Sequence, residues 1–264
     1  MCVNDLICCG AEPLFFLDYF ATGKLSPEQA RDVIKGIAEG CIQSNCTLLG
    51  GETAELPGLY KNNEYDLAGF AVGIVEKNKI IDGSNIKSGD VLIGIESSGL
   101  HSNGYSLAQK ALFEISGFSL DFKDEKLNKP IGEILLTPTF IYTKLIKNLI
   151  CNFEIKGIAN ITGGGLTENI PRIFPENTAC EINLNSWTVP QIFKVIKKAG
   201  NIDIEEMLKT FNNGIGMVLI VNKSDENNIV NEIQKQGFKS YKIGVITELT
   251  QENKKVLYKG ELNA

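Results

Sequence analysis

The chain has 264 residues, of which 43% are hydrophobic and 22% are charged. This composition excludes a disordered chain, a collagen and a coiled coil, and the length predicts one or two domains with a core that needs no disulfide or metal cross-link. With 26 basic and 32 acidic residues the net charge is −6, which argues against nucleic acid or an anionic membrane surface as the main partner.

The cysteines and the N-terminal residues indicate a reducing compartment. The seven cysteines are irregularly spaced without a CxxC pair, and His101 is the single histidine, so the sequence argues against a structural zinc site. Reduced thiols are typical of the cytoplasm. The N-terminus lacks the basic region of a signal peptide, and no apolar run is long enough to span a membrane. We therefore expect a cytoplasmic protein with no membrane contact.

In chain order, the first part of the sequence alternates helix and strand signals. A helix is expected to end at Gly10, because glycine is favoured just after a helix and Pro13 prevents its continuation. Ser26 and Pro27 form a helix start of the N-cap type. The predicted elements are a short buried strand at 14–17, a helix from 26 to about 44, a strand at 46–49 that ends in Gly50-Gly51-Glu52-Thr53, and a strand at 68–75.

The pattern changes near residues 81–83, where we place a domain boundary. The expected elements beyond it are strands at 91–95, 157–161, 214–221, 241–249 and 255–259, and helices at 105–115, 139–150, from 166, 187–199 and 226–236. The sequence thus predicts a mixed α/β (α+β) protein with two unequal domains, at residues 1–82 and 83–264.

Small, polar residues follow three of these strands, at 50–53, 97–104 and 162–165. Glycine lets backbone amides approach an anion closely, and the chain has few arginines to bind phosphate with side chains. None of the three segments has the spacing of a Walker or Rossmann phosphate loop. Asp5 and Glu52 are the candidate magnesium ligands, because magnesium takes one or two carboxylates together with phosphate and water.

His101 lies in the polar segment 97–104, where a side chain faces either solvent or a ligand. A catalytic triad would need this histidine, but no G-x-S-x-G elbow or matching cysteine motif accompanies it. Covalent acyl chemistry is therefore disfavoured.

Several longer segments resemble the phosphoribosylformylglycinamidine cyclo-ligase family, the aminoimidazole ribonucleotide synthetases of purine biosynthesis. The similar segments run collinearly through the chain: MCVND at 1–5, GAEPLFFLDY at 10–19, GGETAELPG at 50–58, SSGLHSNGYS at 97–106, ITGGG at 161–165, ENIPR at 168–172 and FNNGIGM at 211–217.

The resemblance implies ATP-dependent ring closure of formylglycinamidine ribonucleotide, with ATP as co-substrate and Mg²⁺ as cofactor. It implies catalytic roles for His101 and Asn103 and metal binding by Asp5 and Glu52. It also implies the following contacts: with the nucleotide by Asn4, Asp5, Gly50, Gly51, Glu52 and Thr53, and with the substrate by Ser102, Thr162, Gly163, Gly164 and Gly165.

The resemblance further implies the two-domain fold of ATP-using purine synthetases and a homodimer. In that fold the N-terminal domains of two subunits join their sheets into one barrel, and residues 1–82 correspond to the later part of that ATP-binding and dimerisation domain. Family members carry roughly ninety further residues before this segment, including an Asp-Gly-x-Gly-Thr-Lys motif, so we expect an incomplete first domain, a complete second domain and impaired activity. A second departure is Asn160, which stands where the family usually has histidine and cannot titrate near neutral pH.

Two alternatives remain open at this point. One is another member of the same ATP-using superfamily, although the GGETAELPG segment favours the cyclo-ligase. The other is an inactive truncated subunit that only dimerises or binds a purine intermediate.

Overall fold

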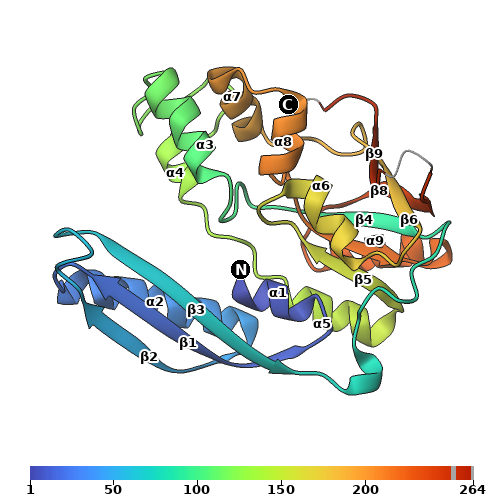
Figure 1. The fold of residues 1–264 in the computed structure, drawn as a ribbon, viewed down its shortest axis with the longest axis horizontal. Helices are drawn as coiled ribbons and strands as arrows, with labels where there is room; N and C mark the ends of the chain where they lie inside the picture. The colour runs from blue at the N-terminus through green and yellow to red at the C-terminus, as the bar shows by residue number, and fades with distance from the viewer. Residues whose placement is uncertain (251–253, 263–264) are drawn as a thin grey trace. The chain divides into compact units, whose positions relative to one another are not determined.

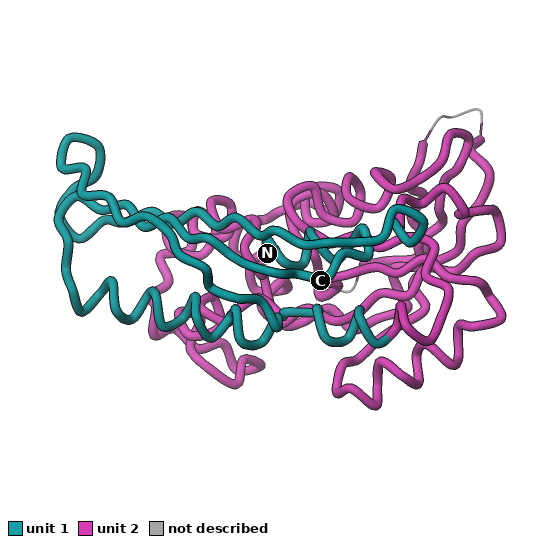
Figure 2. The backbone as a smooth tube through the Cα atoms, turned by 90° about the horizontal axis from the view of Figure 1, so that it is seen from below, with its two compact units in different colours: residues 1–80, 141–148 teal, residues 81–140, 149–264 magenta. Residues whose placement is uncertain are grey.

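The computed structural model describes residues 1–250 and 254–262, and its chain divides into two compact units. Unit 1 comprises residues 1–80 and 141–148, and unit 2 comprises residues 81–140 and 149–264 (Figure 2). Residues 141–148, which the sequence placed in the second domain, therefore pack with the first unit.

Unit 1 is a three-stranded sheet with helices packed against one of its faces. Its elements are α1 (Cys2–Ile7), β1 (Glu12–Thr22), α2 (Pro27–Ser44), β2 (Thr47–Glu55) and β3 (Tyr65–Ile74). The strand order is β2-β1-β3, with β1 parallel to β2 and antiparallel to β3 (Figure 1). The predicted helix start is confirmed, because Ser26 accepts a hydrogen bond from the Gln29 amide.

Two predicted features of unit 1 are wrong in detail. The strand expected at 14–17 extends over Glu12–Thr22 and is largely half-buried, because one face of the sheet is open. Residues 50–53 belong to β2, which stays paired with β1 through Glu55. Gly51 permits this pairing, since a Cβ atom there would lie 2.1 Å from Asp18 Oδ1.

The two faces of this sheet differ. A Cβ atom on Gly69 would meet Cys2, and one on Gly73 would meet Leu6, so α1 covers the face to which these two glycines turn. The intervening residues Phe70, Val72 and Ile74 turn to the other face, because side chains alternate along a strand. They are 60%, 41% and 63% exposed, so unit 1 leaves an apolar face open.

Unit 2 is built on a six-stranded sheet in the order β5-β7-β4-β8-β6-β9. Neighbouring strands are antiparallel, except that β6 and β9 are parallel. The strands are β4 (Val91–Glu96), β5 (Ile155–Asn160), β6 (Thr178–Asn183), β7 (Ile215–Val221), β8 (Ser240–Glu248) and β9 (Val256–Lys259). The helices are α3 (Tyr105–Gln109), continued by a π-helical segment at Lys110–Ile115, α4 (Ile131–Leu135), α5 (Thr143–Asn152), which begins in unit 1, α6 (Gly165–Asn169), α7 (Gln191–Gly200), α8 (Ile204–Thr210) and α9 (Glu226–Lys235).

The central strands of unit 2 are covered on both faces. All of β7 and nearly all of β4 are buried, which explains why both read as continuous apolar runs in the sequence. A buried ion pair joins this sheet, with Lys156 Nζ 2.7 Å from Asp90 Oδ1 and both side chains less than 5% exposed. The sequence missed β6, α4 and α8, and the helix expected at 139–150 begins only at Thr143.

None of the helices in the part of the chain that the structure describes is both long enough and apolar enough to cross a membrane.

Candidate functional site

Three loops of unit 2 meet at one edge of its sheet. β4 and β5 are both antiparallel to β7, which lies between them, so β4 and β5 end at the edge where β7 begins. The loops at 97–104, 161–164 and 211–214 are therefore neighbours (Figure 1). Two of the three carry residues that the sequence predicted for the site.

Asn212 joins two of these loops. Its side-chain nitrogen donates to the Gly99 carbonyl at 2.8 Å. Its side-chain oxygen accepts from the Ser97 hydroxyl at 3.0 Å and from the Gly214 amide at 2.8 Å. Asn212 is 4% exposed, and buried hydrogen bonds of this kind are costly to lose. The loop at 97–104 is thus held by a side chain more than a hundred residues away in the sequence.

His101 is fixed inside its own loop. The residue has a left-handed backbone (φ 59°) and is 3% exposed, and Nε2 accepts a hydrogen bond from the Ser98 amide at 3.1 Å. Burial lowers the pKa of His101 from 6.5 to about 4, so the ring is neutral at pH 7. Because Nε2 accepts this backbone hydrogen bond, the ring helps to fix the conformation of the loop, and a catalytic role for His101 stays a prediction.

Asn169 holds the glycine loop that follows β5. Its side-chain nitrogen lies within hydrogen-bonding distance of three loop carbonyls, those of Thr162 (3.3 Å), Gly163 (3.2 Å) and Gly165 (2.8 Å). Its oxygen accepts from the Thr162 hydroxyl at 3.0 Å. Gly164 and Gly165 have φ values of 98° and 55°, where glycine is favoured. The carbonyls of this loop therefore turn inward to Asn169.

The predicted residues Asn103 and Gly163 lie side by side, although they come from different loops. A Cβ atom on Gly163 would lie 3.4 Å from Asn103 Oδ1. Ser102 is exposed nearby in the chain, and its hydroxyl lies 3.2 Å from the Thr139 hydroxyl. The structure thus brings Asn103 and Gly163 together as neutral hydrogen-bonding groups that can contact an anion or a polar substrate.

The other end of the glycine loop carries negative charge. A Cβ atom on Gly164 would lie 2.8 Å from Glu168 Oε2, and Lys209 is 3.7 Å from the same carboxylate. Glu168 beside Gly164 is paired with Lys209, so an anion meets neutral groups alone only on the Gly163 and Asn103 side.

Asn4 and Asp5 lie next to each other in α1 of unit 1 but in different surroundings. Asn4 is fully buried, and its Oδ1 accepts a hydrogen bond from the Tyr142 amide at 3.1 Å. Asp5 is exposed. Asn4 therefore anchors residues 141–148 to α1, which leaves Asp5 as the member of this pair that can reach a ligand.

Glu52 lies on the face of the unit 1 sheet that α1 does not cover. It pairs with Tyr19 next to the pair Gly51 and Asp18, and Gly51 turns toward the Asp18 side chain. Asp18 pairs with Gly69, which turns to the face that α1 covers, so Glu52 turns to the open face. Gly50, Gly51 and Thr53 are exposed beside it, and the Thr53 amide donates to Glu52 Oε1 at 2.9 Å.

Asp5 and Glu52 are thus carboxylates on opposite faces of one sheet. Carboxylate oxygen is the donor that Mg²⁺ prefers, so each side chain fits a metal that is also held by phosphate oxygens. No group of three or more His, Cys, Asp or Glu side chains in the described residues forms a preformed metal site. Binding of Mg²⁺ by Asp5 or by Glu52 stays a prediction.

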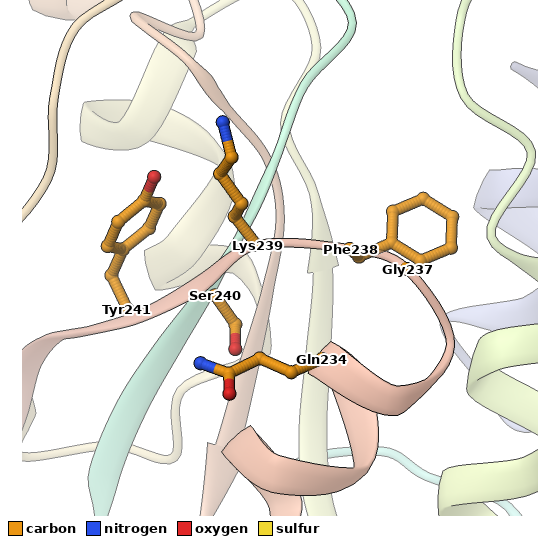
Figure 3. A pocket seen from close by; sticks show the side chains of 6 residues that line it. All are labelled: Gln234, Gly237, Phe238, Lys239, Ser240 and Tyr241. Carbon is orange, nitrogen blue, oxygen red and sulfur yellow. The ribbon is translucent and has the colours of Figure 1, made fainter.

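A separate cavity of about 370 Å³ opens at the start of β8. It is lined by Gln234, Gly237, Phe238, Lys239, Ser240 and Tyr241 (Figure 3). The Ser240 and Gln234 side chains turn toward each other, whereas Lys239 and Tyr241 turn to the other side of the chain. None of the residues predicted for the site lines this cavity.

Sequence reasoning missed Asn169, Asn212 and Asn213. Asn213 donates to the carbonyls of Met207 and Phe211 at 2.8 and 2.9 Å. The Asn-Asn-Gly run at 212–214 was a usable signal, because asparagine followed by glycine marks turns with left-handed backbone. Asn213 and Gly214 indeed have φ values of 49° and 97°.

Comparisons with known proteins identify the class to which this fold and these loops belong. The family described as AIR synthase related protein matches in both of its parts, the N-terminal domain over residues 1–75 and the C-terminal domain over residues 87–256.

Two individual relatives identify the family within this class. The phosphoribosylformylglycinamidine cyclo-ligase of Syntrophotalea carbinolica is 57% identical over 252 residues, which are 96% of this chain and 72% of that protein. The protein of the same name from Thermoanaerobacter sp. (strain X514) is 56% identical over 94% of this chain and 74% of its own length. The chain belongs to the phosphoribosylformylglycinamidine cyclo-ligase family. The expectation of an incomplete first domain stays a prediction.

Solved structures share the fold at low sequence identity. Thiamine-monophosphate kinase from Stenotrophomonas maltophilia K279a matches with a TM-score of 0.72 at 16% identity, covering 98% of this chain and 76% of that one. The hydrogenase maturation protein HypE in complex with ATP matches with a TM-score of 0.71 at 14% identity, covering 97% of this chain and 73% of that one.

The buried His101 predicts a specific pH dependence of stability. Because the pKa of His101 is about 4 in the folded protein and 6.5 is its ordinary value, folding loses stability as the pH falls from 6.5 to 4, by up to about 3 kcal/mol. In His101→Asn, which keeps a side chain that tolerates left-handed backbone, this loss should be absent. Urea unfolding of both proteins at pH values between 7 and 4 measures the difference. Parallel curves would contradict the assignment.

Proposed function

We propose that the protein catalyses the ATP-dependent cyclisation of formylglycinamidine ribonucleotide to 5-aminoimidazole ribonucleotide, with release of ADP and phosphate, in de novo purine biosynthesis. The observation that carries this proposal is the 57% identity to a phosphoribosylformylglycinamidine cyclo-ligase over 96% of the chain. The neighbouring loops of unit 2 support it, since they present neutral hydrogen-bonding groups at one edge of a rigid sheet. The hydrogenase maturation protein HypE, which was solved in complex with ATP, has the same fold.

The reaction requires positioning and charge neutralisation more than covalent work by the protein. The formyl oxygen takes the γ-phosphoryl group of ATP, and the amidine nitrogen then attacks the same carbon and expels phosphate. Backbone amides near Gly163 and the Asn103 amide can orient the departing phosphate, and the exposed Ser102 hydroxyl can contact the substrate. Thr162, Gly164 and Gly165 shape that loop, and His101 positions Asn103 through the loop conformation.

The residues proposed to contact the nucleotide lie in unit 1. We assign Asp5 and Glu52 to Mg²⁺ carried by ATP, with Gly50, Gly51 and Thr53 contacting the nucleotide and Asn4 holding α1 in place. Bound Mg²⁺ neutralises the charge that develops on the transferred phosphoryl group. Because the two carboxylates lie on opposite faces of the sheet, one Mg²⁺ cannot contact both within a single copy of unit 1, and single substitutions distinguish which of the two holds the ion.

The open face of the unit 1 sheet supports a homodimer. Phe70 and Val72 pair with Leu17 and Phe15 on β1, so apolar residues of two strands share this face. Exposed apolar patches of this kind mark protein interfaces. A second copy of the chain is the occupant that we propose, because its own sheet presents the same apolar residues.

The seven cysteines are free thiols, which suits a reducing compartment. We place the protein in the cytoplasm, where the purine intermediates that it acts on are made.

The proposed activity is tested by ADP release in the presence of formylglycinamidine ribonucleotide, ATP and Mg²⁺. We expect ADP formation that depends on the ribonucleotide and is accompanied by the imidazole product. Asp5→Asn should lower kcat about 10²–10³-fold, the usual effect of losing one group that stabilises developing charge, and should raise the Mg²⁺ concentration needed for half-maximal rate. Glu28→Gln, on the exposed first turn of α2, is the matched control. Ribonucleotide-independent ADP release would contradict the proposal.

The dimer is tested separately by light scattering coupled to size exclusion. We expect a dimer mass for the wild type and a monomer mass for Phe70→Asp, because a charge on the apolar face cannot be buried without a partner. Leu136→Asp serves as the control, since Leu136 is 82% exposed on unit 2. A monomeric wild type, or a dimeric Phe70→Asp, would overturn this assignment.

A further inference from the structure

Two cysteines meet where α2 ends and β2 begins. Cys41 lies in the last turn of α2, and Cys46 directly precedes β2. Neither residue has a role in the proposed reaction, and both are free thiols. Their positions in the sequence differ by five, and the turn between them brings the two residues together.

The turn that joins α2 to β2 is a Schellman motif. Asn45 has a left-handed backbone with φ 53°, and its amide donates to the Ile42 carbonyl at 3.2 Å. The Cys46 amide donates to the Cys41 carbonyl at 2.9 Å. In this motif the residues joined by the second bond are the pair whose side chains contact each other. This bond holds the two residues close together at the end of the helix, which is what a disulfide needs, since it spans Cα atoms about 4.4–6.8 Å apart.

The surroundings of the pair keep both thiols protonated. Cys41 and Cys46 are 6% and 8% exposed, and burial raises the pKa of each thiol. The neighbouring Cys46 and the Asp18 carboxylate raise the pKa of Cys41 further. The thiolate is the form that attacks a disulfide, so the pair reacts slowly at neutral pH and faster in mildly alkaline solution.

A small molecule can reach Cys41 through a cavity of unit 1. This cavity has a volume of about 170 Å³ and is lined mainly by apolar side chains, together with Cys2, Cys41 and Ser44. Cys2 is the other thiol in the lining, and its Sγ donates to the Gly69 carbonyl at 3.4 Å. The size and apolar lining favour a compact, uncharged reagent over a large charged one.

We propose that Cys41 and Cys46 form a dithiol site that closes reversibly to an intramolecular disulfide by exchange with a small organic disulfide. The Cys41 thiolate attacks one sulfur of the reagent, which releases one reagent thiol and leaves a mixed disulfide on Cys41. Cys46 then attacks the Cys41 sulfur and releases the second reagent thiol. The protein pair is oxidised by two electrons, the reagent disulfide is reduced by two electrons, and the two protons leave with the reagent thiols.

The bond would tie the last turn of α2 to the start of the strand that carries Gly50, Gly51 and Glu52. Oxidation would therefore lock the turn between α2 and β2 in its present conformation. This inference does not depend on the proposed function, because it concerns only the two thiols and the turn that holds them.

The test uses bis(2-hydroxyethyl) disulfide with the native protein at mildly alkaline pH, followed by acid quenching, intact mass measurement and peptide mapping. We expect the peptide map of the wild type to contain a peptide with both Cys41 and Cys46 that is two hydrogens lighter than its reduced form and carries no reagent adduct. Cys46→Ser should instead stop at the mixed disulfide and carry one 2-mercaptoethanol adduct on Cys41. Cys2→Ser should still close the Cys41–Cys46 bond.

Three results would overturn the inference. They are a cross-link between Cys2 and Cys41, adducts on the exposed Cys151 with no reaction at Cys41, and the same adduct on Cys41 in the wild type and in Cys46→Ser. Because the wild-type map needs no substitution, a variant that fails to fold does not block the test. Incubation of the closed protein with a reducing dithiol should restore two alkylatable cysteines at positions 41 and 46.

Discussion

The site of unit 2 depends on the amide of Asn212. This one side chain bonds the Ser97 hydroxyl, the Gly99 carbonyl and the Gly214 amide, and so it joins the loop after β4 to the loop before β7. The partners are neutral groups. Both the oxygen and the nitrogen of the Asn212 side chain form hydrogen bonds within the protein. A buried amide in this position sets the loop conformation without placing a charge next to the proposed phosphate position.

Buried asparagine side chains hold other segments of the chain in the same way. Asn169 gathers the carbonyls of the glycine loop, and Asn4 anchors residues 141–148 within unit 1. The buried charged pair of unit 2, Lys156 and Asp90, lies at the start of β4 and β5, whereas the site loops follow the ends of these strands. The buried charges therefore lie at the start of β4 and β5, and the buried neutral amides lie at the loops of the candidate site.

The sequence predicted the parts of this account that depend on local patterns. The helix start at Ser26, the apolar runs of β4 and β7, and the glycine loop after β5 follow from capping, burial and turn chemistry. It could not place Glu52 in a paired strand, because that depends on the approach of Gly51 to Asp18 across the sheet. Nor could it show that His101 is locked by the Ser98 amide or that Asn212 spans two loops, since these contacts join residues whose spacing carries no signal.

Amide hydrogen exchange at Gly214 tests the central claim, that buried asparagine side chains hold the site loops in place before any ligand binds. In the ligand-free wild type the Gly214 amide should exchange slowly, because it donates to Asn212 Oδ1 at 2.8 Å. In Asn212→Ala it should exchange about 10–100-fold faster, as expected for the loss of one buried hydrogen bond, while Asn222→Ala, near the far end of β7, should leave it unchanged. Rapid exchange of Gly214 in the wild type, or equal rates in the wild type and Asn212→Ala, would contradict the account.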